Sequence, residues 1–203
     1  MELDRFTLCE LAELVDYPGP SCSHVLAECR RHPERLREPA HADLLEFVDW
    51  AAARSPQELE ELYSTTFDSS DECALEVGWH LYGEAYQRGI FLVEMRQRLR
   101  AALIQEGREL PDHLSLVLRW LAVAASSSGD SPVARDAERL VRLAIVPALA
   151  SICAALERKR SPWLPLLRAL GRAFDPAFAP RRVARADAMA RSFAGDAGGG
   201  GCR

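Results

Sequence analysis

The chain of 203 residues lacks the spacings that mark most metal and nucleophile sites. Its six cysteines contain no CxxC pair, and its five histidines form no ligand-spaced cluster with them. Phosphate-cradling glycine loops, HExxH sequences and nucleophile elbows are also missing. We therefore expect reduced thiols, no metal site and no catalytic residues.

A secretory signal and a long apolar run are missing as well. The first residues, Met1 to Arg5, are acidic where a signal would be basic, and no apolar stretch follows them. The longest apolar run, Leu143 to Leu156, is interrupted by Pro147 and is shorter than the roughly 20 residues of a membrane-spanning helix. We expect a cytoplasmic protein with no membrane insertion, in which this run is the most buried part of a bundle.

Positive charge is scarce in the first part of the chain. Residues 1–125 carry a net charge of −11 and residues 126–203 carry +6, in agreement with the net −5 of the whole chain. An acidic surface repels the phosphates of nucleic acids and attracts basic peptides. We therefore expect no nucleic-acid partner, although a merely solvated acidic surface would give the same counts.

Alternating strand patterns and internal repeats are missing, whereas the 3.6-residue period of helices runs through nearly every segment. The length and the 48% hydrophobic content suit a single-domain, all-α helical bundle. We expect one helical domain over residues 1–193 and a disordered glycine-rich tail over residues 194–203. The expected helices cover about residues 3–15, 21–31, 44–52, 56–63, 73–82, 84–106, 111–125, 132–158 with a bend or break at Pro147, 161–170 and 181–193.

Two helix starts are specified by local sequence. Ser55 to Glu58 has the residues of a capping box, with a proline at the first helical position. Pro111 fits the first position of another helix, where Asp112 would lie in the positive field of the helix dipole. Adjacent helical residues do not face one another, so Asp112 and His113 are expected to make two separate polar contacts at a helix start.

Polar and aromatic residues form three clusters, at residues 63–68, 80–89 and 109–114, that interrupt the bundle pattern. A groove that binds a basic peptide needs apolar anchors and carboxylates, and two close carboxylates can hold an arginine side chain by paired hydrogen bonds. The anchors and acids in these clusters are Tyr63, Phe67 and Tyr82, and Asp68, Glu84 and Asp112. As carboxylates at a surface groove, Asp68 and Asp112 are expected to contribute little to folding.

Several of these residues have a plainer structural alternative. Tyr63 and Phe67 are four residues apart on one helix and could be core residues. His80 could be a hydrogen-bonded core histidine, and Glu84 and Arg88 could form a surface ion pair.

Two further carboxylates also have a plain alternative. Asp112 could serve only as a dipole-favoured helix residue, and Glu109 as a solvated loop carboxylate.

All four tryptophans lie in helical patterns, so we interpret them as packing residues: Trp50, Trp79, Trp120 and Trp163.

Together the three clusters resemble the motifs of the cytoplasmic assembly chaperones for molybdenum oxidoreductases, and in particular the nitrate reductase delta-subunit (NarJ-type) branch of that group. The resemblance covers about residues 8–170 and includes the turn at Tyr17 and Pro18. The matching residues are Tyr63, Phe67 and Asp68 in the first motif, His80, Tyr82, Gly83, Glu84, Arg88 and Gly89 in the second, and Glu109, Pro111, Asp112 and His113 in the third. The sequence departs from the pattern at its C-terminus, because chains of this type usually run longer.

The resemblance implies a non-catalytic chaperone that binds the N-terminal segment of the catalytic subunit of a molybdenum oxidoreductase. It would hold that subunit until the bis-molybdopterin guanine dinucleotide cofactor is inserted, with the matching residues as client-binding residues. The client would be nitrate reductase, as part of nitrate assimilation, or a related oxidoreductase. The resemblance implies no permanently bound cofactor and leaves transient contact with the client's molybdopterin open. We expect a monomer or a weak homodimer, because an apolar groove can also recruit a second copy.

Other classes of function compete with this interpretation. One is an adaptor that stays in a respiratory complex as a stoichiometric subunit. Another is a small helical hydrolase whose site would have to come from His80, His113, Asp68, Asp112 and Cys73, although no spacing supports it. A metal-storage or cofactor-carrying role is weaker still, because the cysteines are dispersed.

Overall fold

The computed structural model describes residues 3–32, 35–127 and 130–181, and this part of the chain is all-α, as the periodicity predicts. Its α-helices are α1 (Arg5–Leu14), α2 (Cys22–Arg31), α3 (Ala40–Ala52), α4 (Pro56–Tyr63), α5 (Val77–Tyr82), α6 (Tyr86–Ala101), α7 (Leu114–Ala124), α8 (Pro132–Leu140), α9 (Val146–Arg158) and α10 (Leu164–Phe174). Two π-helices follow α4 and α8, namely η2 (Ser64–Asp68) and η3 (Val141–Ile145). The expected tail at 194–203 lies outside the described residues, as does the expected helix at 181–193 apart from Arg181.

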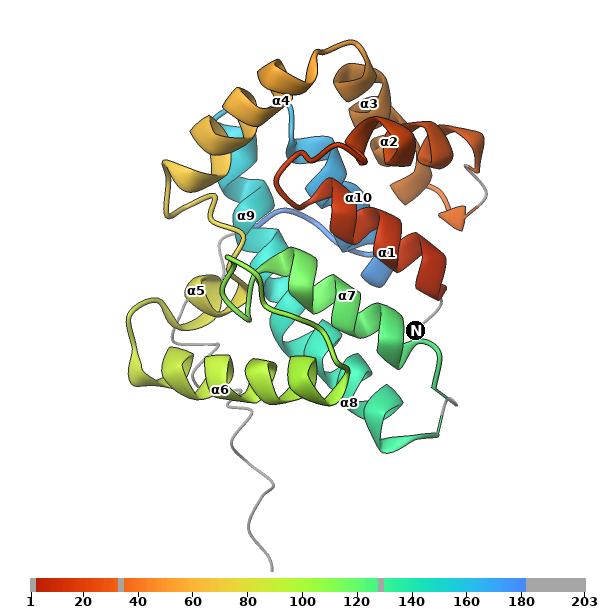
Figure 1. The fold of residues 1–203 in the computed structure, drawn as a ribbon. Coiled ribbons are helices and arrows are strands. Elements are labelled where there is room, and N and C mark those ends of the chain that lie inside the picture. The colour runs from red at the N-terminus through yellow and green to blue at the C-terminus, as the bar shows by residue number, and fades with distance from the viewer. Residues whose placement is uncertain (1–2, 33–34, 128–129, 182–203) are drawn as a thin grey trace, which may run out of the picture.

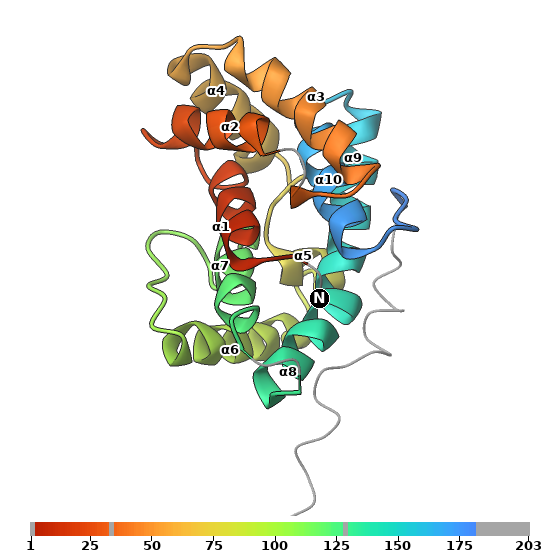
Figure 2. The same cartoon turned by 90° about the vertical axis from the view of Figure 1, so that its right-hand side faces the viewer.

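The helices form two groups joined by the long α9. Figure 1 and Figure 2 both show α2, α3 and α4 at one end of the molecule and α6 and α8 at the other, with α9 extending between them. The most extensive helix contacts join α1 to α7 and α3 to α10, while α5 packs on α6 and α9. The short α5 therefore lies between α6 and α9.

The core draws most of its fully buried residues from α7, α9 and α10. Apolar residues with 0% exposure include Leu114, Val117, Leu118 and Leu121 on α7, Leu149, Ile152 and Leu156 on α9, and Leu166 and Leu170 on α10. Full burial of each such side chain contributes about 1.5 to 3 kcal/mol relative to its exposure.

One continuous helical stretch, Pro132–Arg158, is long and apolar enough to cross a membrane by length and composition. The structure buries 61% of its most apolar window inside the protein, as is common for the core helix of a soluble fold. The division expected near Pro147 takes the form of a π-helix: η3 separates α8 from α9, and Pro147 lies in the first turn of α9 directly after it. Proline lacks an N–H and crowds the carbonyl four residues earlier, and the wider π-turn relieves both problems.

Of the two helix starts that local sequence specifies, the one at Ser55 is confirmed and the one at Pro111 is wrong. The capping box before α4 is confirmed, because Ser55 Oγ accepts from the Glu58 N–H at 3.3 Å and Glu58 Oε2 accepts from the Ser55 N–H at 2.8 Å. Other boundaries differ from the expectation: α3 begins at Ala40, α5 at Val77, α7 at Leu114 and α10 at Leu164, and α6 ends at Ala101.

Candidate functional site

The three predicted clusters meet at one cavity of about 380 Å³. The predicted residues that line it are Tyr63, Phe67, Asp68, Arg88, Glu109 and His113. The loop after η2 and the start of α5 add Ser70, Asp71, Ala74, Leu75, Glu76 and Trp79. Segments separated by up to about fifty positions in the sequence thus form one concave surface, which we call the acidic cavity.

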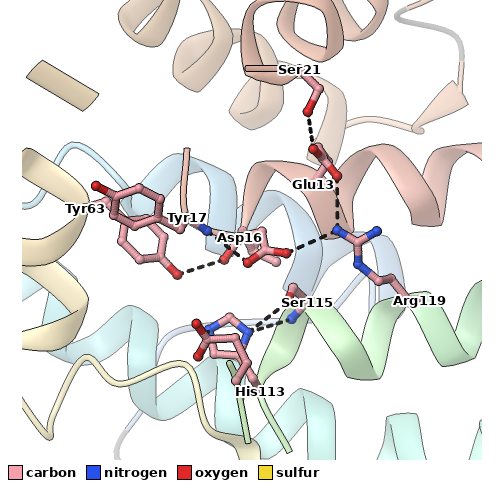
Figure 3. A network of polar contacts seen from close by, with 10 residues as sticks. Glu13, Asp16, Tyr17, Ser21, Tyr63, His113, Ser115 and Arg119 are labelled. Atoms are coloured by element: carbon pink, nitrogen blue, oxygen red, sulfur yellow. Dashed lines mark hydrogen bonds and ion pairs between the residues drawn. The ribbon is translucent and has the colours of Figure 1, made fainter. Parts of the chain in front are cut away.

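The π-helix η2 places one wall of the acidic cavity. Tyr63 and Phe67 are 4% and 5% exposed, and their ring centroids lie 4.9 Å apart. The Tyr63 hydroxyl donates a hydrogen bond to the Val15 backbone oxygen at 3.3 Å (Figure 3). Asp68, one residue further, is exposed. The two aromatic residues are therefore core residues and cavity wall at once, while Asp68 remains accessible at the edge.

Trp163 backs this aromatic wall. Its ring centroid lies 5.7 Å from that of Tyr63 and 5.4 Å from that of Phe67. On its other side it contacts Phe47 of α3 at 5.2 Å. The packing role predicted for Trp163 is confirmed, because it connects the cavity wall to α3.

Trp79 differs from the other tryptophans, and its interpretation as only a packing residue is wrong. Trp79 is partly exposed and lines the acidic cavity, where its Nε1 donates to the Asp71 backbone oxygen at 2.8 Å. The Arg88 guanidinium carbon lies 5.3 Å from the Trp79 ring centroid, within the range of a cation–π contact. Arg88 also approaches Asp112, with 3.8 Å from its Nε to Asp112 Oδ2. The expected surface ion pair of Arg88 with Glu84 does not form among the described residues.

The turn before α7 is fastened to the segment before α5. The Val77 N–H donates to the Asp112 backbone oxygen at 2.9 Å, and the Leu114 N–H donates to the Leu75 backbone oxygen at 2.9 Å. Backbone groups around Asp112 are therefore engaged with a distant segment and cannot form a first helical turn. For this reason α7 begins at Leu114, three residues later than Pro111.

Asp112 is fully buried, so its expected position at a surface groove is wrong. Its Oδ2 accepts a hydrogen bond from the Gly78 N–H at 3.0 Å, and its Oδ1 has no hydrogen-bond partner among the described residues. A Cβ on Gly78 would lie 2.7 Å from Asp112 Oδ2 and 2.8 Å from a Phe91 ring carbon. Only glycine therefore allows this contact between α5 and the turn.

Burial sets the protonation of Asp112. Loss of solvent raises the pKa of Asp112 to about 6, the Arg88 guanidinium and the Gly78 N–H oppose that rise, and Glu76 reinforces it. The carboxyl therefore changes charge at mildly acidic pH, inside the structure rather than at its surface.

His113 caps α7 and does not form a catalytic pair with Ser115. Its Nδ1 accepts the Ser115 N–H at 3.3 Å and lies 2.8 Å from Ser115 Oγ (Figure 3). Its Nε2 lies 4.0 Å from Glu109 Oε2. The three residue types suggest a hydrolase triad, but Ser115 is 0% exposed and cannot reach a substrate. Cys73 is also fully buried, and burial raises the pKa of its thiol, which makes it a poor nucleophile.

The remaining predicted residues do not line the acidic cavity. His80 is 8% exposed and its Nε2 bonds the Ala74 backbone oxygen at 2.6 Å, so it is the hydrogen-bonded core histidine of the plainer alternative. Tyr82 is buried against Phe91, with ring centroids 5.9 Å apart. Gly83 ends α5 with a φ of 59°, a conformation that favours glycine. Pro111 is buried, and Glu84 and Gly89 are exposed.

An arginine that the sequence analysis missed connects α7 to α1. Arg119 pairs with Glu13 at 3.0 Å and with Asp16 at 3.1 Å (Figure 3). Asp16 also accepts the Tyr17 N–H at 3.0 Å, and the Tyr17 ring contacts the Tyr63 ring at 5.5 Å. The network thus positions Asp16 and Tyr17, in the turn after α1, against the cavity wall. Its sequence signal was available, since Arg119 is the one charged residue within α7.

The acidic cavity carries an excess of negative groups. Its acids are Asp68, Asp71, Glu76 and Glu109, against Arg88 and His113 as nitrogen groups. Asp71 and Glu76 escaped the sequence analysis because they lie between two of the clusters. Within the described ranges, no group of three His, Cys, Asp or Glu side chains could hold a metal ion. The arrangement therefore suits a cationic group beside an aromatic wall.

Comparison with known proteins agrees with the resemblance seen in the sequence. The family described as "Nitrate reductase delta subunit" matches residues 33–169, which include all three clusters. The probable nitrate reductase molybdenum cofactor assembly chaperone NarJ of Bacillus subtilis (strain 168) is 28% identical over 122 residues, which is 59% of this chain and 66% of the relative. The nitrate reductase molybdenum cofactor assembly chaperone NarJ of Escherichia coli (strain K12) is 30% identical over 149 residues, 73% of this chain and 59% of the relative. The matched region thus spans less than two thirds of either relative.

Proposed function

Since the chain belongs to the nitrate reductase delta subunit family, we propose that it is an assembly chaperone for the catalytic subunit of a molybdenum oxidoreductase. Its relatives carry names of nitrate reductase molybdenum cofactor assembly chaperones. The client would be nitrate reductase or a related enzyme. The protein would act in the cytoplasm, bind the client before its cofactor is inserted, and catalyse no reaction itself.

The finer part of this proposal depends on one observation, that residues of all three clusters line the acidic cavity. We propose that the cavity receives a basic side chain from the N-terminal segment of the client. The accessible carboxylates Asp68 and Glu109 lie at its edge and can accept hydrogen bonds from a guanidinium or an ammonium group. A hydrogen bond to a charged group contributes about 1.5 to 3 kcal/mol, so two such bonds would select a basic residue.

Aromatic residues would add contact area beside the charge. Phe67 and Trp79 line the same cavity, and flat rings bind both apolar stems and cationic heads. The positive charge of Arg88 would repel the client's basic side chain. Asp112 can neutralise that charge, because its Oδ2 lies 3.8 Å from Arg88 Nε. A single basic residue flanked by apolar residues is therefore the segment that this surface fits best.

The same lining argues against a resident cofactor in this cavity. A pterin dinucleotide carries phosphates, and four carboxylates would repel them. We propose that the molybdenum cofactor goes directly to the client and that any contact with the chaperone lies outside the acidic cavity.

Calorimetry tests the proposal. The client would be identified by affinity capture from the native host under anaerobic growth, and a synthetic peptide of its N-terminal segment would be titrated at low and high salt. We expect binding that weakens with salt, and about tenfold weaker binding in the double variant D68N/E109Q. The matched control is D49N, which removes an exposed carboxylate of α3 away from the cavity.

Two results would contradict this function. Folded protein that gives no heat at either salt concentration would reject peptide binding. Equal losses in D49N and the double variant would reject the acidic cavity as its site. The adaptor alternative is tested separately: gel filtration of the mature oxidoreductase should show this chain absent, whereas a subunit would be present in stoichiometric amount.

A further inference from the structure

Helix α6 carries apolar side chains on two opposite faces. Its inner face is buried and consists of Phe91, Met95 and Leu99. On its outer face lie Tyr86, Ile90 and Val93, with exposures of 82%, 36% and 53%. These three residues follow the i, i+4, i+7 spacing of one helical stripe. A surface helix normally has one such stripe. With two, α6 has the pattern of a helix that is covered on both sides.

Gly89 makes this outer face flat. A Cβ at Gly89 would meet nothing within 4 Å, so no neighbour inside the molecule requires glycine here. Glycine within a helix costs about 0.5 to 1 kcal/mol relative to alanine. Its position on the same face, between Tyr86 and Val93, leaves bare backbone that another helix can approach closely.

Opposite charges mark the two ends of the outer face. Glu84 is exposed just before α6 begins, and Arg100 is exposed in its last turn. Arg100 follows Val93 by seven residues and therefore lies on the same stripe. Gln97 lies between them on that stripe and is also exposed.

We propose that this face binds the α6 helix of a second copy of the chain, as an antiparallel pair about a two-fold axis. With the axis between Ile90 and Val93, Ile90 of each copy contacts Val93 of the other. The same register places Tyr86 against Gln97 and Glu84 near Arg100 of the other copy. The contact is self-complementary, as a two-fold interface requires.

Charge favours the antiparallel direction over the parallel one. A parallel two-fold pair would place Glu84 beside Glu84 and Arg100 beside Arg100, and like charges at such contacts repel. The antiparallel pair forms the opposite-charge contact twice. One helix pair is smaller than a standard interface, so the dimer should be weak and concentration-dependent.

The proposed dimer leaves the acidic cavity free. Arg88 follows Tyr86 by two positions, about 200° around the helix, and it lines the cavity on the inner side of α6. A second copy on the outer face would therefore not cover the cavity, and each copy could bind its own client. This inference does not rest on the proposed function.

Sedimentation velocity over a wide range of protein concentration tests the proposal. We expect the wild-type sedimentation coefficient to rise with concentration toward that of a dimer, and V93D to stay monomeric throughout. V133D is the matched control, since Val133 is an exposed apolar residue of α8 with 43% exposure, and it should behave like the wild type. Circular dichroism establishes that both variants are folded.

Charge reversal tests the direction of the pair. E84R and R100E should each weaken the dimer, and the double variant E84R/R100E should restore it, because the swapped charges again lie opposite each other. Wild-type protein that stays monomeric up to millimolar concentration would overturn the proposal. A double variant weaker than either single one would also overturn it. Monomeric wild type together with weaker client-peptide binding by V93D would assign the face to the client instead.

Discussion

Two aspartates near the acidic cavity lie in different surroundings. Asp112 lies at the base, the buried turn behind the lining residue Arg88, where it is 0% exposed and bonded to the Gly78 backbone; Asp68 lies at the edge, exposed on η2. Both belong to the family motifs, and the sequence predicted the same client-binding role for both. A motif residue can thus stabilise the walls of the cavity or contact its occupant, and burial distinguishes these two roles.

The base is continuous with the core, and the edge is not. Leu114, Val117 and Leu118 follow the buried turn directly and are all 0% exposed. Substitutions at the base should therefore change the free energy of unfolding, and substitutions at the edge should change client affinity alone. Three variants test this division.

The largest effect is expected for L118A, deep in α7 behind the base. Removing the buried side chain loses its transfer free energy and leaves a cavity, at a cost of about 2 to 5 kcal/mol. Denaturant unfolding should show this loss as a lower midpoint with an unchanged slope. Below the melting transition, client affinity should stay within about twofold of the wild-type value. A loss of affinity without a loss of stability would contradict the division between base and edge.

The second-largest effect is expected for D112N, as a pH-dependent change in the free energy of unfolding. Its pKa of about 6 in the folded protein exceeds the ordinary 3.8, so folding favours the neutral carboxyl. The stability from this group is full below about pH 4 and is lost as the pH rises through 6, by on the order of 3 kcal/mol. Asparagine stays neutral at every pH. The free energy of unfolding of D112N relative to the wild type should therefore rise by about 3 kcal/mol between pH 4 and pH 7.

The control for this measurement is D49N, because Asp49 is exposed. This variant shows how much of any difference comes from removing a surface carboxylate elsewhere. A D112N profile parallel to that of the wild type would mean that Asp112 is ionised without cost in the folded protein, and the base would then resemble the edge.

The smallest effect on stability is expected for D68N, at the edge. An exposed carboxylate away from special backbone features contributes within about 0.5 kcal/mol to folding. Client-peptide affinity should nevertheless fall several-fold, and the loss should shrink at high salt because exposed charges are screened. Calorimetry and thermal unfolding of the same sample give both quantities. A melting temperature well below the wild-type value would place Asp68 with the base.

Features of the fold that depend on adjacent residues could be predicted from the sequence. The capping box at Ser55 involves partners only three residues apart, and it formed as expected. The start of α7 depends instead on Leu75 and Val77, more than thirty positions away, whose backbones bond the turn at 112–114. No local pattern contains that information, so the prediction followed Pro111 and was wrong by three residues.

The candidate site shows the same limit. Its clusters were found from unusual groups of polar and aromatic residues, and six of the predicted residues line the cavity. Burial of Asp112 could not be predicted, because the sequence contains no sign that the Gly78 N–H would donate a hydrogen bond to its carboxylate. Trp79 was assigned to packing because helical spacing alone does not tell which face of a short helix meets solvent.

The acidic cavity has a thermodynamic consequence that follows from its discontinuous walls. Its lining comes from segments around residues 63–79, from Arg88 and from residues 109–113, so the unfolded chain has no such surface. Any occupant that binds only the native state raises the free energy of unfolding, by about 2.7 kcal/mol at a ligand concentration one hundred times its dissociation constant. A polypeptide that occupied the cavity would therefore also stabilise the fold that binds it.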